Sequence, residues 1–227
     1  MPKEAEMIPA PTPAERQPLA DDALEAFGTV IRGRRSVRRF RPDPLPDELV
    51  DRVLEAGLWA PSPHGTQPWR FAVLRAVETR AQLADAMAAS WRHNLAMDGE
   101  SEEVILGRLA GSRRRLTEAP VLILVSLDTR DLDHYPDPAR AAAERTMAIQ
   151  SLGACVQNML LAAHANGIDA GWMCAPLFCP EIVVASLGLD PAIEPQALLA
   201  LGHAAADPKR RPRRSLGALL VFDDRDS

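Results

Sequence analysis

The segment 139–166 is the strongest constraint on the fold of this chain. Its residues have the spacing of a helix that is apolar on nearly every side, and they include Ile149, Leu152 and Met159. A helix without a polar face must be buried in a core or in an interface. The run Val121–Leu127 is almost continuously apolar and has the length of a strand. Such a run predicts a strand that is covered on both faces. The chain therefore needs a layered fold that hides both elements.

The other periodic segments predict helices with short strands between them, which is an α+β order. Helices are expected from Asp21–Asp22 to Gly33, over 46–60, over 76–118 with an interruption at Asp98–Gly99, and over 180–187. Strands are expected over 69–74, 168–174 and 196–201, and the apolar stretch 216–222 is expected to add a strand to this sheet or to that of a partner. Residues 1–20 carry five prolines and no apolar period, so they predict a flexible tail before a single domain, 21–227.

Composition excludes several classes of protein. The net charge of −5 over 227 residues argues against a basic nucleic-acid binder. No apolar run approaches the roughly 18 residues of a membrane span, and the first residues lack the apolar stretch of a secretory signal. The three cysteines do not form a disulfide framework. These features predict a cytoplasmic protein with reduced thiols and without a membrane partner.

Basic side chains gather in two clusters near the two ends of the chain. Of 26 basic residues only Lys3 and Lys209 are lysine, so the other 24 are arginine. The clusters are Arg32, Arg34, Arg35, Arg38, Arg39 and Arg41, and Lys209, Arg210, Arg211, Arg213 and Arg214. A guanidinium group presents a planar fork that matches phosphate oxygens. Each cluster is thus either half of an anion clamp or a solvated loop.

The loop Ala60–Phe71 places prolines, hydroxyls, an imidazole and an amide between an expected helix and an expected strand. Such a loop offers donors and acceptors to a flat polar ring. The sequence contains no Rossmann glycine fingerprint, phosphate-binding loop, GxSxG or HExxH motif. Cys174 and Cys179 have no second pair, so no metal site is predicted. A cofactor that carries the chemistry would explain the missing protein catalysts.

Three stretches in this order resemble the FMN-dependent nitroreductase family over roughly residues 24–222: Arg34–Phe40, the Ala60–Phe71 loop, and Leu201–His203 followed by 209–214. The middle of the chain is similar to the nitroreductase-type C-terminal domain of the two-domain enzyme of deazaflavin coenzyme biosynthesis. The segments that carry this second resemblance are 90–95, 97–99, 118–120, 134–137 and 144–147. The chain has no room for the ligase domain of that enzyme, so we expect a stand-alone reductase half.

The resemblance implies a nitroreductase-like fold with a mostly antiparallel sheet flanked by helices. It also implies a homodimer, with the helix 139–166 at the interface and FMN bound by both subunits. It assigns FMN binding to Arg34, Arg35, Ser36, Arg38, Ser62, Pro63, His64, Gln67, Met173, Cys174, Arg211 and Arg213. Matching the biosynthetic domain places Trp91, Asn94 and Tyr135 near the substrate.

The resemblance implies an FMN-dependent oxidoreductase whose flavin passes hydride to a small-molecule substrate, with NAD(P)H or another reductant as the electron source. The substrate suggested by the closer resemblance is a dehydro precursor of the deazaflavin coenzyme. One alternative is a broad NAD(P)H-dependent nitro or quinone reductase. A second is a non-catalytic protein that binds a flavin or deazaflavin, and a polyanion binder is disfavoured by the acidic balance and the scarcity of aromatic residues.

Overall fold

The structure, a computed structural model, describes residue 8 and residues 18–208 and 210–224. Lys209 and most of the expected tail 1–20 lie outside the described residues. The chain divides into two compact units, Met1–Gly33 and Arg34–Ser227, and each is treated by itself. The assignment of residues 21–33 to the main domain therefore stays a prediction. None of the described helices combines the length and apolar character that crossing a membrane would need.

The first unit contains helix α1, Asp21–Gly33, which buries none of its residues. The second unit contains five helices and four strands among its described residues: α2 (Asp47–Leu58), β1 (Trp69–Leu74), α3 (Val77–Met97), α4 (Glu102–Glu118), β2 (Val121–Asp128), α5 (Pro138–Ala165), β3 (Asp169–Met173), α6 (Pro180–Leu187) and β4 (Ile193–Gly202). These elements confirm the expected α+β order, and Gly99 lies in the left-handed region where the expected helix 76–118 is interrupted.

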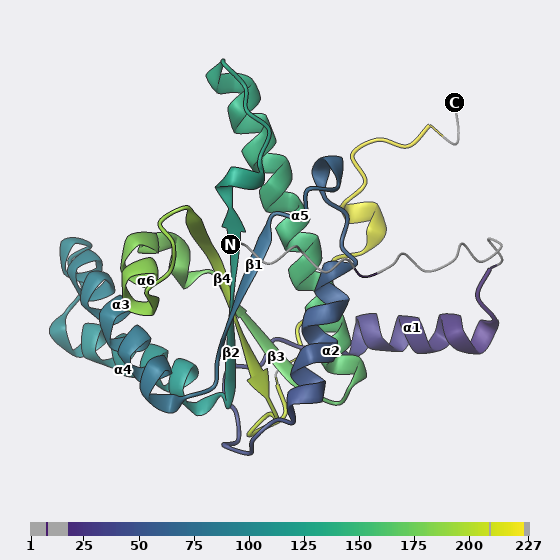
Figure 1. The fold of residues 1–227 in the computed structure, drawn as a ribbon. Coiled ribbons are helices and arrows are strands. Elements are labelled where there is room, and N and C mark those ends of the chain that lie inside the picture. The colour runs from purple at the N-terminus through teal and green to yellow at the C-terminus, as the bar shows by residue number, and fades with distance from the viewer. Residues whose placement is uncertain (1–7, 9–17, 209, 225–227) are drawn as a thin grey trace. The chain divides into compact units, whose positions relative to one another are not determined.

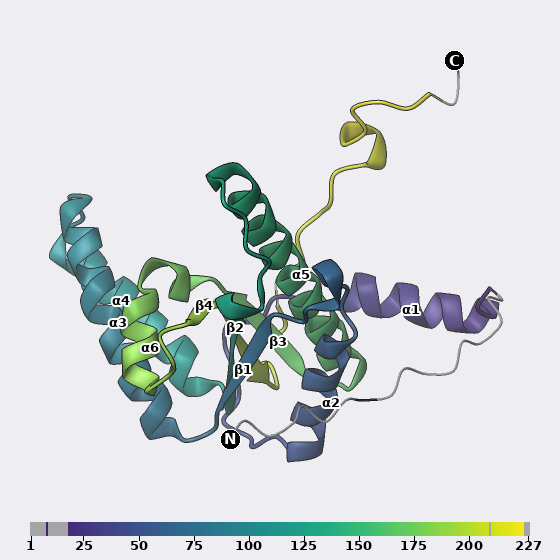
Figure 2. The same cartoon turned by 45° about the horizontal axis from the view of Figure 1, so that its top comes forward.

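The four strands form one antiparallel sheet in the order β1-β2-β4-β3. All eight residues of β2 are buried, as expected of a central strand. Because side chains alternate across a strand, Ile123 and Val125 face one core while Leu122 and Leu124 face the other. Helices α2 and α5 cover the first face, and α3, α4 and α6 cover the second (Figures 1 and 2).

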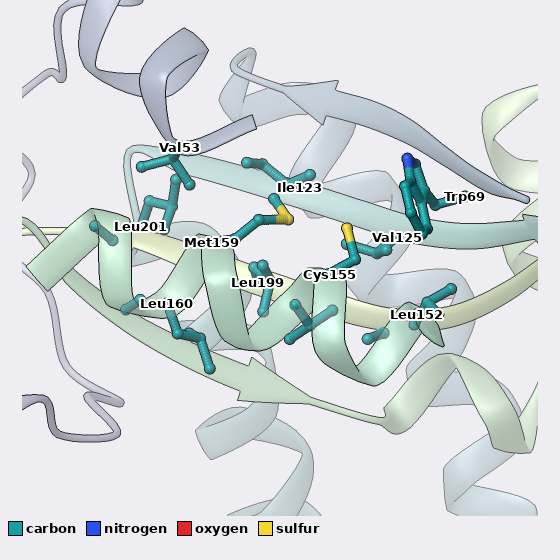
Figure 3. Packing of buried hydrophobic residues seen from close by; sticks show 14 of the residues in the cluster. Val53, Trp69, Ile123, Val125, Leu152, Cys155, Met159, Leu160, Leu199 and Leu201 are labelled. Carbon is teal, nitrogen blue, oxygen red and sulfur yellow. The ribbon is translucent and has the colours of Figure 1, made fainter. Parts of the chain in front are cut away.

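Helix α5 packs into the core of its own chain from Ala148 onward, whereas residues 139–147 are exposed except for Glu144. Its residues Cys155 and Met159 point towards Ile123, Val125 and the neighbouring side chains of the sheet (Figure 3). Burial raises the pKa of the Cys155 thiol to about 12, which leaves this thiol inert. The apolar pattern of residues 148–163 is therefore explained within one chain, but that of the exposed first turns, with Met147 39% exposed, is not. A role of α5 at a dimer interface stays a prediction.

The prediction that residues 216–222 add a strand to the sheet of their own chain is wrong, while pairing with the sheet of a partner stays a prediction. Residues 216–222 form no strand, and only Leu216–Ala218 takes up a single 3-10 turn. Their apolar side chains are exposed, Phe222 to 82%. A strand needs a neighbouring edge for its backbone hydrogen bonds, and no described strand pairs with this segment.

The outer edge of β3 is covered by residues 36–40. The amide of Val37 donates to the carbonyl of Ala170 at 2.9 Å, and Val37 and Phe40 are buried. This close approach requires a glycine at position 171, because a Cβ there would lie 2.2 Å from the carbonyl oxygen of Val37. The backbone of Gly171 needs no left-handed conformation, so the requirement is purely steric.

Replacing Gly171 with alanine should lower the free energy of unfolding by about 1–3 kcal/mol, because the new methyl group must displace backbone. Chemical denaturation measures this difference. The matched control is Gly107→Ala in α4, where an added Cβ meets no atom within 4 Å and should stabilise the helix by about 0.5–1 kcal/mol. Equal stability of Gly171→Ala and the native protein would contradict the steric argument.

Candidate functional site

Backbone pairing holds the basic turn, residues 34–41, in place. Ser36 bridges to Ala170 of β3, and the amide of Arg41 donates to the carbonyl of His203 at 2.8 Å. Two buried side chains of this turn, Val37 and Phe40, face the core. The intervening Ser36, Arg38 and Arg39 are exposed, and Arg34 and Arg35 are half-buried. The turn therefore presents guanidinium groups from a rigid base.

The same pairing brings in the second cluster. Phe40 bridges to Ala204, and the amide of Ala205 donates to the carbonyl of Arg39, so the chain leaves β4 alongside the basic turn. Arg213 comes near enough to Arg34 to act on its charge. Burial lowers the pKa of Arg34 below its ordinary value, and repulsion from Arg213 and Arg35 lowers it further. Two arginines 179 positions apart in the sequence thus lie close enough for their charges to repel each other, and Arg34 is partly desolvated there.

The arginines of the basic turn and of the C-terminal cluster differ in whether they pair with a carboxylate. Arg39 pairs with Glu118 at 3.0 Å and Arg41 with Asp43 at 3.1 Å. Within the described ranges, no salt bridge joins Arg34, Arg38 or Arg213 to a carboxylate. Partly buried like charges repel each other unless an anion lies between them. The arrangement fits an anionic group such as a phosphate.

Arg211 contributes its backbone to the C-terminal arm, residues 210–214. Its carbonyl accepts a hydrogen bond from Arg213 Nη1 at 3.1 Å, and its own side chain is exposed. Of the two C-terminal arginines expected at the phosphate, Arg213 is the one whose charge acts on Arg34. The participation of Arg211 stays a prediction.

A small hollow of about 10 Å³ lies next to the basic turn. Ser36, Arg38 and Met173 line it, so the turn and the end of β3 meet as expected, while Cys174 is exposed at the following position. Arg115, at the end of α4, also lines this hollow. Burial and then repulsion from Arg38 and Arg114 lower the pKa of Arg115. Sequence reasoning missed Arg115, because only the fold carries the last turn of α4 to this place.

The proline-rich loop, residues 61–68, is ordered by its own hydrogen bonds. Ser62 Oγ accepts from the amide of Gln67 at 3.1 Å, and Thr66 Oγ1 donates to the carbonyl of Pro63. His64 and Gln67 both lie in the left-handed region, with φ of 53° and 49°. Residues Pro63–Gly65 form a 3-10 turn, η1, which contacts α5. Non-glycine residues in this region are found where the surroundings hold them, often at binding sites.

The register of the sheet separates this loop from the basic turn. The loop enters β1 at Trp69, which pairs across β2 with Glu194 of β4. The basic turn lies beside Ala170, which pairs with Leu201 of β4. Positions 194 and 201 are seven residues apart, roughly 23 Å along a strand. One chain therefore presents the two predicted halves of the cofactor site at opposite ends of its sheet.

The three predicted substrate residues do not gather in one chain. Trp91 is half-buried and Asn94 exposed on α3, which packs on the second face of the sheet. Tyr135 precedes α5, on the first face, where the guanidinium of Arg140 lies 5.2 Å from the centre of its ring. Their shared role at the substrate stays a prediction.

A network of ion pairs lies at the end of the sheet that is nearest to the proline-rich loop. The Asp128 side chain is 5% exposed at the end of β2 and accepts hydrogen bonds from the guanidinium of Arg130, with Arg70 at 3.5 Å. The hydrogen bonds from Arg130 lower the pKa of Asp128, and the charge of Arg70 adds to this effect. Arg70 also binds Asp131, which ties β1 to the segment before α5.

Comparison with known proteins identifies the family. Residues 31–203 match the model of the nitroreductase family, so the chain belongs to that family. A protein of Thermus thermophilus named NADH dehydrogenase is 31% identical over 211 residues, which cover 83% of this chain and 92% of the relative.

Solved structures share the fold. A protein of Desulfovibrio desulfuricans designated a nitroreductase, crystallised with FMN, is 32% identical with a TM-score of 0.66, and the match covers 87% of this chain and 96% of that one. The FMN-dependent nitroreductase NfnB of Mycobacterium smegmatis, in complex with NADPH, is 23% identical with a TM-score of 0.69, over 89% of this chain and 100% of that one. The expected nitroreductase-like α+β fold is confirmed.

The lowered pKa of Asp128 makes a prediction about acid stability. A carboxylate whose pKa is lower in the folded state stabilises the fold above its unfolded pKa, about 3.9, and loses this contribution as the pH falls through the folded value. Asp128→Asn should therefore cost about 1–3 kcal/mol at neutral pH, and this cost should shrink below about pH 4.

Denaturation curves of the two proteins across this pH range measure the effect. The control is Asp85→Asn, which removes the exposed partner of Arg113 and should change stability by less than about 0.5 kcal/mol. A cost for Asp128→Asn that stays constant down to about pH 2 would contradict the assignment.

Proposed function

We propose that this chain is an FMN-dependent oxidoreductase that holds the flavin phosphate between Arg34 and Arg213. The observation that carries the proposal is the meeting of these two arginines in a partly buried place where both charged neighbours of Arg34 are cations. A phosphate with nearly two negative charges turns this repulsion into attraction. Membership of the nitroreductase family and the FMN complex of the relative from Desulfovibrio desulfuricans support the choice of FMN.

The residues of this chain bind and orient the cofactor. Arg34, Arg35 and Arg213 are assigned to the phosphate, with Ser36 donating its hydroxyl. Arg38, which is assigned to the same phosphate, and Arg115 line the hollow beside Met173 and would add positive charge near the bound cofactor. FMN, when bound, supplies the hydride chemistry, which explains why no nucleophile or metal motif appears in the sequence. The role of the protein is placement and electrostatics.

We propose one class of electron donor and two candidate classes of substrate. A nicotinamide is favoured as the electron source, because the relative from Thermus thermophilus is named NADH dehydrogenase and the related NfnB structure holds NADPH. The same names favour a broad nitro or quinone reductase as one candidate. The other is a reductase that adds hydride and a proton across the C=C bond of a dehydro precursor of the deazaflavin coenzyme, supported by the resemblance of segments 134–137 and 144–147 to that biosynthetic domain.

We further propose that each flavin site is built by two chains. The basic turn and the proline-rich loop lie at opposite ends of one sheet, so a single flavin reaches both only if the loop comes from a partner subunit. Apolar side chains left exposed in α1 and near the C-terminus support a homodimer, because such surface is costly to leave in water. They are Leu24, Phe27, Ile31, Leu216, Leu219, Leu220, Val221 and Phe222.

The first experiment identifies the bound ligand and tests which arginines bind it. The purified protein should show flavin absorbance and release FMN, identified by mass, when it is denatured. Arg34→Ala and Arg213→Ala should each weaken FMN binding roughly tenfold to a hundredfold, the loss of one charge-assisted contact. Arg41→Ala is the matched control, because Arg41 lies in the same turn but is paired with Asp43.

Three outcomes would decide against parts of this proposal. Protein that stays colourless after reconstitution with FMN rejects the cofactor. Unchanged FMN affinity in both variants rejects the arginine clamp. Flavin that is bound but not reduced by NADH or NADPH supports the non-catalytic alternative. Turnover rates measured side by side with nitroaromatics, quinones and the dehydro precursor identify the class of substrate.

Mixing two inactive variants tests the shared site. One variant carries Arg34→Ala and Arg38→Ala, and the other carries Ser62→Ala and Gln67→Ala. A mixed dimer holds one site with all the changes and one with none, so random reassortment should restore about a quarter of the native flavin sites. Titration with FMN counts them. If each site lies within one chain, mixing restores none.

A further inference from the structure

Glu144 is a buried carboxylate without the partners that such a group needs. It lies in the second turn of α5 and is only 2% exposed. Its Oε1 accepts one long hydrogen bond from the amide of Asp133 at 3.5 Å, and its Oε2 has no hydrogen-bond partner in the described part of the chain. Burying a charge is costly unless it is paired or coordinates a metal. The described residues therefore leave one oxygen of this buried carboxylate without a partner.

Two more ligating side chains converge on Glu144. His64 Nε2 lies 3.6 Å from Asp133 Oδ2, and one ligand atom from each of His64, Asp133 and Glu144 lies within 4.8 Å of the other two. The three come from separate segments: the turn η1, the segment before α5, and α5 itself. Because α5 is held in the core, Glu144 is a rigid point, while His64 and Asp133 are exposed and can adjust.

We propose that His64, Asp133 and Glu144 bind one divalent transition-metal ion, with zinc as the best match. One imidazole nitrogen and two carboxylate oxygens form a mixed donor set that suits zinc better than magnesium, which prefers oxygen alone. Ligand atoms around a tetrahedral zinc ion lie about 3.3 Å apart, since each is about 2.0–2.1 Å from the metal. The 3.6 Å pair is close to this spacing, and small rotations of the two exposed side chains close the rest.

Three protein ligands leave a position open for water or another ligand. The site lies at the end of the sheet where β1 begins, whereas the basic turn lies at the other end. Within one chain it is therefore separate from the arginine pair proposed for the phosphate. His64 also belongs to the proline-rich loop that is proposed to reach the flavin of a partner subunit, but the zinc site is argued from the buried Glu144 and its converging ligands. The sequence predicts no metal site, because its three ligands are spread over 80 positions and match no metal-binding motif.

Zinc titration of the purified full-length protein, freed of metals with a chelator, tests the site by calorimetry. One zinc ion should bind per chain and magnesium should not compete. Cobalt bound in its place should give absorption bands at wavelengths longer than those of flavin. Glu144→Gln and His64→Gln should each weaken zinc binding about a hundredfold or more, because even second-shell changes cost roughly 10–100-fold.

His93→Gln is the matched control, because His93 is an exposed histidine on α3, on the other face of the sheet, and zinc binding should not change. Circular dichroism checks that each variant folds, and Asp133→Asn, an exposed position, serves if Glu144→Gln does not. Absence of zinc binding in the native protein would overturn the proposal. So would zinc binding that survives Glu144→Gln and Asp133→Asn but is lost in Cys174→Ser.

Discussion

The pairing of residues 36–41 with β3 and with the end of β4 is the constraint on which the candidate site depends. It seals the outer edge of the sheet, and it does so only because Gly171 lets the carbonyl of Val37 approach its backbone. The same contacts lead the chain beyond Ala205 past the basic turn. A steric requirement in the core thus produces an electrostatic feature at the surface, the meeting of Arg34 and Arg213. The charge cluster is costly by itself, which is why an anion is its natural complement.

The sheet also divides the chemistry of the chain between its two ends. Guanidinium groups and the hollow beside Met173 lie at one end, while the proline-rich loop, His64 and Glu144 lie at the other. Strand length sets this separation, and no local rearrangement of loops would remove it. A homodimer with the two ends of different chains facing each other is the simplest way to use both. The exposed first turns of α5 and the exposed apolar side chains near the C-terminus are available for such a contact.

Local patterns predicted most of the secondary structure correctly. The apolar run of β2 and the break at Gly99 each act through backbone or burial preferences that depend on a few neighbouring residues. The segment 216–222 forms no strand in the sheet of its own chain, because a strand also needs more than local composition. It has the apolar composition of a strand, but a strand exists only where an edge is available to pair with it.

Sequence patterns alone indicated the fold class, the basic turn and the proline-rich loop. Secondary-structure propensity and charge clustering depend only on residues that are close in the sequence, so they can be recognised without the structure. Only the tertiary structure decided which charges meet. The proximity of Arg213 to Arg34, the place of Arg115 beside Arg38, and the convergence of His64 and Asp133 on Glu144 all join distant segments. Such encounters depend on strand register and on how the chain leaves the sheet, and these follow from the packing of the whole core, which no single motif encodes.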